Sequence, residues 1–243
     1  MTDHGYIERD FADDPIGSDL PMCEAAVHDR RDWADLMQLQ KERKSSPLDF
    51  HMMNEVPILN QASLKYCWAF CITAGCMNRQ AFAGINNPLP TLSATSLAAP
   101  IKNFRNVGGY VLEAARGAKD GIAETSVWPE LSMRRAHSTE ASVRISRSLN
   151  SLASFSELPS RDIQALVSVL IDEDNARPVA IALPWWRHAV LALRARLQND
   201  ELRIDYVNSY GNRWGSHGYG VLTEDKAEAH EQIVIENMEA RSE

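Results

Sequence analysis

A cysteine stands at the point where a polar turn gives way to an apolar helix. The turn covers residues 60–65, and the expected helix runs from Cys67 to about Phe82. The N-terminus of a helix carries partial positive charge and free N–H groups, and both favour thiolate over thiol. Thiolate is the strongest side-chain nucleophile near neutral pH. The position of Cys67 therefore indicates nucleophilic chemistry.

A thiolate nucleophile needs a base, and one histidine stands out for that role. Seven histidines are present, and most lie in polar or charged sequence, whereas His188 begins an apolar strand. Such a position alone is more often typical of a buried core histidine than of a catalyst. Asn208 follows the next predicted strand, however, and an antiparallel hairpin would bring the two side chains together. The Asn208 amide oxygen would then accept from the imidazole and fix its tautomer.

The remaining cysteines give weaker signals. Cys71 and Cys76 lie further along the Cys67 helix, and we expect both to be small buried hydrophobic side chains. Their spacing does not match common zinc sites and no histidine lies close in sequence, so we expect no metal. A disulfide framework is not expected either, because no secretory signal precedes the four cysteines.

Length and composition indicate a soluble globular protein. The 243 residues suffice for one large domain or two small ones, and 44% are hydrophobic and 24% charged. The net charge of −8 argues against general nucleic-acid binding, which needs clustered Lys and Arg. No apolar run is long enough to cross a membrane. We therefore expect a cytoplasmic protein without nucleic-acid or membrane partners.

Acidic residues concentrate at the two ends of the sequence. Residues 1–20 hold six acids against one arginine, and residues 224–243 hold seven acids against two basic residues, so each segment carries −5. We interpret both segments as solvated tails. The alternative is that they dock onto a basic assembly partner.

Helical patterns dominate the first half of the chain and strand patterns the second. We expect Ser45-Ser46-Pro47 to end the first helix and residues 131–160 to be irregular. The expected helices cover residues 23–43, 67–82, 91–99, 110–119 and 160–172, and the expected strands cover residues 179–183, 188–194, 202–207 and 219–222. This segregation favours an α+β protein over a parallel α/β sheet.

A set of short motifs in one order along the chain resembles the papain-like cysteine peptidase family. Together they cover residues 45–223. The motifs are Gln61-x5-Cys67-Trp68-Ala69-Phe70, Leu92-Ser93, Asn106-Val107-Gly108-Gly109-Tyr110, Gly121-Ile122, Trp128-Pro129-Glu130, Pro178-Val179-Ala180-Ile181, His188-Ala189-Val190 and Asn208-Ser209-Tyr210-Gly211-x2-Trp214-Gly215-x2-Gly218-Tyr219. Each motif is modest alone, but the ordered set is specific.

The resemblance implies a two-lobed α+β fold with the cleft between the lobes. A helical N-terminal lobe would cover about residues 60–130, and an antiparallel, strand-rich lobe about residues 131–223. Residues 1–44 would form an acidic, helical N-terminal extension, and residues 224–243 an acidic C-terminal tail.

The resemblance also implies a site that needs no metal and no cofactor. Cys67 would be the nucleophile, His188 the general base and then acid, and Asn208 the residue that orients His188. Gln61 and the backbone N–H of Cys67 would form the oxyanion hole.

Substrate-binding residues follow from the same resemblance. Gly108 and Gly109 would let the backbone of a polypeptide substrate pair with the chain. Trp68 and Trp214 would also bind substrate, and Trp214 would shield the His–Asn hydrogen bond from water.

The sequence departs from the family pattern in three places. Residues 62–66 replace the family's Gly-Ser-Cys-Gly-Ser, and Tyr210 replaces a tryptophan. Residues 182–187 join a strand directly to His188, where the family has a longer excursion that builds part of the substrate pocket. Trp185 and Trp186 then either fill the gap by packing or line the subsite beside the thiol.

These observations predict a cysteine endopeptidase or a related amide hydrolase. An alternative is that the papain-like fold serves as a non-catalytic component of a larger assembly, for example a bacteriophage virion, which the shortened loop and acidic ends favour. The residue types at all four catalytic positions argue against it. Transglutaminase-like or deamidating chemistry is a third possibility. Residues 1–44 are either a short pro-segment or a permanent docking arm.

Overall fold

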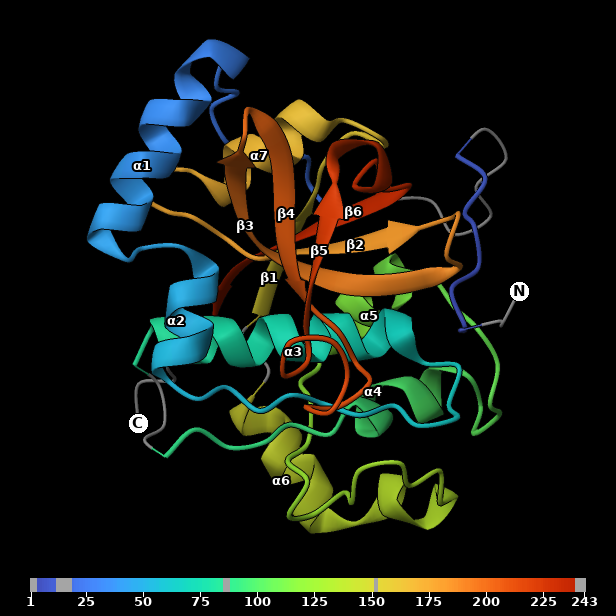
Figure 1. The fold of residues 1–243 in the computed structure, drawn as a ribbon. Coiled ribbons are helices and arrows are strands. Elements are labelled where there is room, and N and C mark those ends of the chain that lie inside the picture. Colours follow the sequence, from blue (N-terminus) through green and yellow to red (C-terminus); the bar gives the residue numbers. More distant parts are fainter. Residues whose placement is uncertain (1–3, 12–18, 85–87, 151–152, 239–243) are drawn as a thin grey trace.

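Figure 1 shows a six-stranded sheet with helices on both faces, in a computed structural model that describes residues 4–11, 19–84, 88–150 and 153–238. The helices are α1 (Trp33–Arg43), α2 (Pro47–Met53), α3 (Cys67–Phe82), α4 (Ala94–Ile101), α5 (Val111–Ala118), α6 (Ala141–Leu149) and α7 (Ile163–Leu170). The strands are β1 (Ala153–Glu157), β2 (Val179–Leu183), β3 (His188–Gln198), β4 (Glu201–Val207), β5 (Tyr219–Thr223) and β6 (Glu231–Met238). The predicted α+β class is confirmed.

All strand pairs of the sheet are antiparallel, in the order β1-β6-β2-β3-β4-β5. The β2–β3 hairpin places His188 opposite Leu183 at its turn end. Leu191 of β3 pairs with Val207 of β4, so the start of β3 runs beside the residues that follow β4. This register brings His188 and Asn208 to the same end of the sheet.

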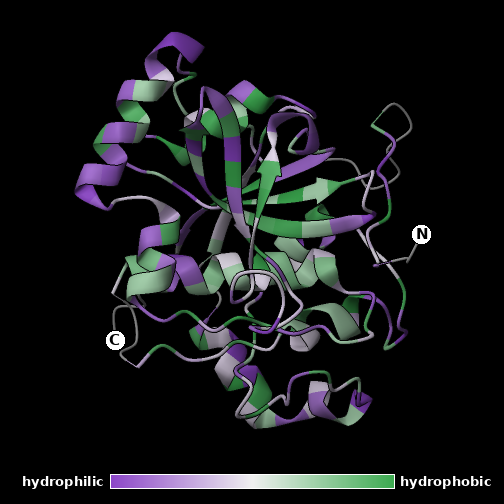
Figure 2. Ribbon diagram, viewed as in Figure 1, coloured by the Kyte–Doolittle hydropathy of each residue, from purple (hydrophilic) through white to green (hydrophobic). Residues whose placement is uncertain are grey.

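The sheet separates two hydrophobic cores. Because successive side chains of a strand point to opposite faces, one set of residues packs on α3, α4 and α5 and the alternate set packs on α7 and Trp33 of α1. The first set includes Ala180, Ala182, Leu191, Leu193, Ile233 and Ile235, and the second includes Val179, Ile181, Val190, Ala192 and Val234. Figure 2 shows the central helix α3 as mostly pale or green, whereas purple residues dominate α1.

Helix α3 lies against the sheet at unusually short range. At Gly75 an added Cβ would lie 2.7 Å from the side chain of Ile235 in β6, so only glycine permits this approach. Tyr66, just before the helix, is fully buried, and its hydroxyl donates to the Arg105 carbonyl at 2.8 Å. The position of the helix start that carries Cys67 is therefore fixed by two contacts, the packing of Gly75 on β6 and the hydrogen bond of Tyr66.

The C-terminal segment differs from the solvated acidic tail that the sequence predicted. Residues 231–238 form β6, which pairs with both β1 and β2 inside the sheet. Three consecutive apolar residues, Ile233 to Ile235, are fully buried because both faces of the strand are covered. Glu231 is also buried and accepts hydrogen bonds from the backbone N–H groups of Val111 and Leu112 at the start of α5.

Other boundaries also differ from expectation. The first helix begins at Trp33 rather than at residue 23. Ser46 opens α2 through a capping box with Asp49, so the Ser-Pro sequence that ends one helix also starts the next. Residues 131–160, expected to be irregular, contain α6 and β1. The predicted bounds of α3 and β2 agree with the structure.

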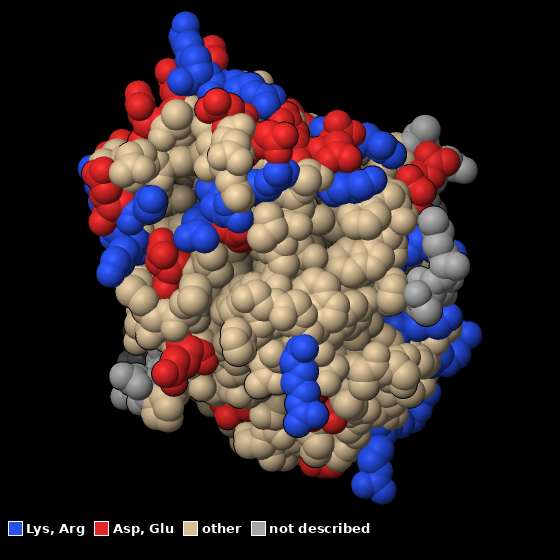
Figure 3. Space-filling view, in the orientation of Figure 1, with Lys and Arg blue, Asp and Glu red and all other residues tan. Residues whose placement is uncertain are grey.

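Charged side chains are unevenly distributed over the surface. Figure 3 shows them gathered over α1 and the neighbouring end of the sheet, with a broad, largely uncharged face in the middle. No helix within the described residues is both long and apolar enough to cross a membrane.

Burial of β6 can be tested by truncating one of its side chains. Ile235→Ala is expected to lower the free energy of unfolding by about 2–5 kcal/mol, because it leaves a cavity against α3. The exposed Glu228→Ala variant, from the same C-terminal region, should change it by less than about 0.5 kcal/mol. Urea unfolding measures both. Equal, small effects would mean that the segment is a tail.

Candidate active site

Cys67 is the first residue of α3, and its side chain is completely buried. The first N–H groups of a helix have no acceptor within the helix and carry its positive end. The turn before it is held by Trp68, whose indole N–H donates to the Lys65 carbonyl at 3.1 Å. The candidate nucleophile thus lies where the sequence predicted, at a helix N-terminus.

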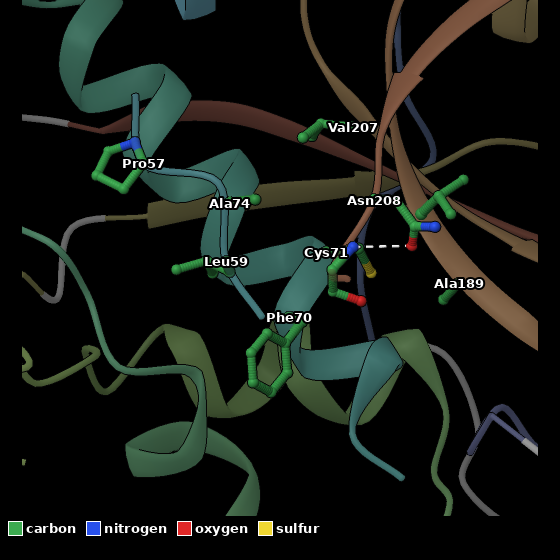
Figure 4. A pocket seen from close by; sticks show the side chains of 10 residues that line it. Pro57, Leu59, Phe70, Cys71, Ala74, Ala189, Val207 and Asn208 are labelled. Atoms are coloured by element: carbon green, nitrogen blue, oxygen red, sulfur yellow. Dashed lines mark hydrogen bonds between the residues drawn. The ribbon is translucent and has the colours of Figure 1, made fainter. Parts of the chain in front are cut away.

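His188 and Asn208 are joined by a short hydrogen bond. His188 Nε2 lies 2.7 Å from Asn208 Oδ1, and both residues are buried. The backbone N–H of Ser209 also donates to Asn208 Oδ1, at 2.8 Å, the bond drawn in Figure 4. Because that atom is the acceptor of a backbone N–H, it is the amide oxygen. The imidazole therefore carries its proton on Nε2, and Nδ1 is the nitrogen that can accept one.

Aromatic rings enclose His188. Tyr210 stacks on it with ring centroids 4.8 Å apart, Trp186 packs at 4.7 Å, and His4 meets it edge-on at 5.3 Å. Burial lowers the pKa of His188 to about 3, although the bond to Asn208 opposes this and His4 reinforces it. In this arrangement the imidazole is neutral.

Gln61 lies in the same cluster and is fully engaged. Its Nε2 donates to the Leu64 carbonyl at 2.6 Å and to the His4 carbonyl at 3.3 Å, while its Oε1 accepts from the Ser209 hydroxyl. Its backbone N–H donates to the Ser209 carbonyl at 2.8 Å. The amide that the sequence predicted as an oxyanion donor thus binds a carbonyl of the N-terminal segment.

The N-terminal segment, residues 4–11, runs along the predicted substrate-pairing glycines. The N–H of Gly109 donates to the Gly5 carbonyl at 2.9 Å, and the N–H of Ile7 donates to the Gly109 carbonyl at 3.1 Å, which makes a parallel bridge around Tyr6. An added Cβ at Gly108 would lie 2.4 Å from the Gly5 carbonyl oxygen, so glycine allows this approach. Figure 1 shows the segment in dark blue beside the β2–β3 turn.

Buried side chains anchor this segment. Tyr6 is 1% exposed and its hydroxyl lies 3.1 Å from His230 Nδ1. Arg9 is 3% exposed and pairs with Glu157 at 2.8 Å and with Glu231 at 3.9 Å. The prediction of a solvated N-terminal tail is therefore wrong for this part of residues 1–20.

The two tryptophans that the sequence predicted as substrate-binding residues, Trp68 and Trp214, have different surroundings. Trp68 is completely buried, and an added Cβ at Gly109 would lie 2.7 Å from its ring, so Trp68 lies beneath the glycine instead of lining the surface. Trp214 stacks on Trp186 at 6.2 Å, and Trp186 packs on His188. Trp186 also packs against the core on the α7 side of the sheet, so its described contacts are those of a packing residue that touches the imidazole.

Three residues of the cluster had either no role in the sequence analysis or a role that was left undecided. They are His4, Trp186 and Tyr210, and the Tyr210 hydroxyl lies 2.7 Å from His4 Nδ1. Tyr210 was visible as an aromatic replacement within a motif. Nothing in the sequence pointed to His4, because it lies far along the chain from every other member of the cluster.

Behind the His–Asn pair lies a small enclosed space of about 10 Å³, lined by apolar side chains together with Cys71, Asn208 and Ser209 (Figure 4). It has room for no substrate.

Cys71 and Cys76 are buried as predicted, and burial raises the pKa of both thiols, that of Cys76 to about 12. Within the described part of the chain, no group of His, Cys, Asp and Glu side chains is placed to hold a metal ion.

Several solved structures share this architecture. A digestive procathepsin L proteinase from the larval midgut of Tenebrio molitor aligns with a TM-score of 0.63 at 20% identity, over 77% of this chain and 66% of that one. Xylellain, a cysteine protease from Xylella fastidiosa, aligns with a TM-score of 0.59 at 14% identity, over 75% of this chain and 83% of that one. The bromelain protease from Ananas comosus aligns with a TM-score of 0.58 at 16% identity, over 77% of this chain and 97% of that one. The chain has the papain-like fold.

At these identities the likeness is one of fold. The papain-like chain spans 66% of the length of each of the two Tenebrio molitor procathepsins. No protein-family model matches it, and none of the curated proteins compared with it is similar in sequence. The α+β papain-like fold expected from the ordered motifs is therefore confirmed, whereas the roles of the site residues have to be argued from the geometry of the site.

Displacing the N-terminal segment should expose Cys67. Gly5 has a φ of +107°, and an added Cβ would lie 2.3 Å from the Lys65 carbonyl oxygen, so Gly5→Val forces the segment away. We expect the rate of Cys67 alkylation by iodoacetamide, measured by peptide mass, to rise at least tenfold.

The matched control is Gly84→Val, which changes a second glycine of positive φ whose Cβ would meet nothing within 4 Å. It should leave the alkylation rate of Cys67 at the wild-type value. An unchanged rate in Gly5→Val would show that the segment does not protect the thiol.

Acid should destabilise the fold through its buried histidines. Burial lowers the pKa of both His51 and His188 to about 3, so between pH 6.5 and 3 the unfolded chain binds protons that the folded chain does not. Each pH unit in that window then removes about 1.4 kcal/mol of stability per histidine. Glu231 acts oppositely, because its pKa is raised to about 7 and its contribution grows as pH falls towards 4.5.

Urea unfolding between pH 7 and 4 measures this balance. His51→Phe should show a shallower loss of stability on acidification than the wild type, whereas the exposed His217→Gln should match the wild type. Parallel curves for His51→Phe and the wild type would contradict the assignment.

Proposed function

We propose that this papain-like chain is a cysteine-type peptidase or amide hydrolase that works by acyl transfer through Cys67, His188 and Asn208. The observation that carries the proposal is the 2.7 Å bond from His188 Nε2 to Asn208 Oδ1. It fixes the tautomer in which Nδ1 is the basic nitrogen. A buried amide that orients a buried imidazole, together with a cysteine at a helix N-terminus, supplies a nucleophile, a base and an orienting group.

The proton follows one route through the reaction. The Cys67 thiol gives its proton to His188 Nδ1, and the sulfur attacks the substrate carbonyl carbon. When the tetrahedral intermediate collapses, the carbon–nitrogen bond breaks and the imidazolium returns the proton to the leaving amine. Water then attacks the thioester, with His188 again as base, and releases the acid and the thiol.

Gln61 supplies the stabilisation of the developing negative charge. Its Nε2 already donates to a peptide carbonyl, that of His4, at 3.3 Å. A substrate carbonyl that replaces the His4 carbonyl would meet the same donor, together with the N–H groups at the start of α3. Loss of one such donor lowers kcat by about 100- to 1,000-fold.

The N-terminal segment holds the proposed enzyme in a closed state. It engages Gln61, packs on His188 and pairs with Gly109, three groups that a substrate would need. These contacts of residues 4–11 support the pro-segment alternative over a permanent docking arm. Docking of an assembly partner through acidic residues at the chain ends stays a separate proposal.

A polypeptide is the proposed substrate. The pairing of Gly109 with the N-terminal segment supports it, because a backbone already occupies the site in extended form. The named structural neighbours include cysteine proteases. The cytoplasmic location stays a prediction, as do the bacteriophage origin and the virion role of the non-catalytic alternative.

An epoxide inhibitor of thiol proteases tests the proposal. In the Gly5→Val chain we expect one adduct by intact mass, located on Cys67, together with hydrolysis of a peptide library. Cys67→Ala in the same background should abolish both. His188→Ala should slow labelling at least 100-fold, because the thiol loses its base.

The matched control is Cys71→Ala, four residues further along α3, which should label like the parent. Equal labelling of the parent and the His188→Ala variant would overturn the proposal. Labelling without any peptide hydrolysis would instead favour the non-catalytic alternative.

A further inference from the structure

The Tyr210 hydroxyl lies beside the imidazole nitrogen that can accept a proton. Its oxygen is 3.5 Å from His188 Nδ1, and the two rings stack with an angle of 25° between their planes. The papain-like pattern has tryptophan at this position, so the hydroxyl is a feature of this chain. A phenol hydroxyl both donates and accepts hydrogen bonds, whereas an indole N–H only donates. Tyr210 can therefore accept a hydrogen bond from a protonated Nδ1, which tryptophan cannot.

Tyr210 is held in place by contacts outside the N-terminal segment. Its backbone forms an antiparallel bridge with Asn60, in the turn before α3. Its ring meets that of Trp214, in the loop between β4 and β5, with centroids 5.9 Å apart. Neither contact involves residues 4–11, so the hydroxyl stays near the imidazole when these residues move away.

In the closed chain, His4 binds the same hydroxyl. The Tyr210 oxygen lies 2.7 Å from His4 Nδ1, a good hydrogen-bond distance, whereas 3.5 Å to His188 Nδ1 is long for a hydrogen bond. The hydroxyl is thus drawn towards His4. Departure of His4 with the N-terminal segment lets it approach His188.

The phenol keeps its own proton during the proposed reaction. Burial raises the pKa of Tyr210 far above its ordinary value, and the charges of Cys67 and Tyr206 raise it further. His4 is the titratable side chain whose charge acts on His188, and it lowers the pKa of the imidazole. The thiol proton therefore still goes to His188 Nδ1, and the hydroxyl acts as a neutral neighbour of that nitrogen.

We propose that the Tyr210 hydroxyl is a catalytic group that binds His188 Nδ1 once the N-terminal segment has left, and so stabilises the imidazolium. This inference rests on the proposed peptidase function. Before proton transfer the hydroxyl donates to the neutral Nδ1, and afterwards its oxygen accepts from the Nδ1–H. The second bond has a charged donor and is about twice as strong as the first. The hydroxyl therefore shifts the thiol–imidazole pair towards thiolate and imidazolium.

Alkylation of Cys67 tests this effect in the full-length Gly5→Val chain. The rate with iodoacetamide is measured from pH 4 to 9, because only the thiolate reacts. Tyr210→Phe should move the midpoint of the rate–pH curve up by about one pH unit, so that below the midpoint labelling is about tenfold slower. Above the midpoint the thiolate is fully formed in both chains, and the two rates should agree.

The matched control is Tyr206→Phe, which removes the hydroxyl of a second buried tyrosine in the same aromatic cluster. The Tyr206 ring lies 6.3 Å from that of Trp186, and among the described residues no hydrogen bond joins its hydroxyl to His188. This variant should keep the midpoint of the parent. Equal shifts in the two variants would assign the effect to altered packing and overturn the proposal.

The closed chain gives a second test, with an effect of opposite sign. In the wild-type background, labelling waits for the N-terminal segment to leave, and Tyr210→Phe removes the bond that holds His4. Above the midpoint the rate should therefore rise about two- to tenfold. An unchanged or lower rate there would contradict the binding of the hydroxyl by His4.

The pKa of His188 provides a measurement that does not depend on thiol reactivity. In the Gly5→Val chain with Cys67→Ala, NMR of the imidazole should show that Tyr210→Phe lowers this pKa, because the imidazolium loses an acceptor. Tyr210→Trp should lower it as well, since an indole cannot accept from Nδ1–H. A pKa that stays at the parent value in both variants would overturn the proposal.

The outcomes separate this inference from the proposed function. If His188→Ala slows labelling while Tyr210→Phe keeps the midpoint of the parent, the hydroxyl has no part in proton transfer and the peptidase proposal stands. If His188→Ala labels as fast as the parent, His188 is not the base, and both proposals fail.

Discussion

The bond between His188 and Asn208 depends on the pairing of β3 with β4, and the candidate site depends on that bond. Each partner lies at the end of a strand, and the register Leu191–Val207 brings the two ends together. The Ser209 N–H then holds the amide oxygen towards the imidazole. The tautomer of the His188 imidazole is thus determined by the register of β3 and β4 and by one backbone hydrogen bond.

The N-terminal segment engages the groups that the proposed substrate would use. It engages Gln61, Gly109 and His188. It also encloses His188 so that burial lowers the pKa of the imidazole to about 3. Closure therefore has two physical effects, since it blocks access and removes the proton acceptor from water.

Local patterns predicted the elements that carry the site, and long-range contacts account for what they missed. The bounds of α3 and the start of β3 follow from apolar periodicity and turn residues. The strand β6 was missed because its acidic flanks resemble a solvated tail, whereas Glu231 is buried by bonds to Val111 and Leu112. The docking of Tyr6 on His230 joins residues 224 positions apart, and no local pattern encodes such a contact.

The place of β6 has a consequence for the order in which the protein assembles. This strand lies between β1 and β2, and it contributes Glu231, which binds both the start of α5 and Arg9. A ribosome makes residues 231–238 long after the N-terminal segment and Cys67. Until they emerge, β1 and β2 lack a common neighbour and Arg9 lacks part of its anchor. The N-terminal segment therefore gains its full set of anchors only after the last strand of the sheet has been made.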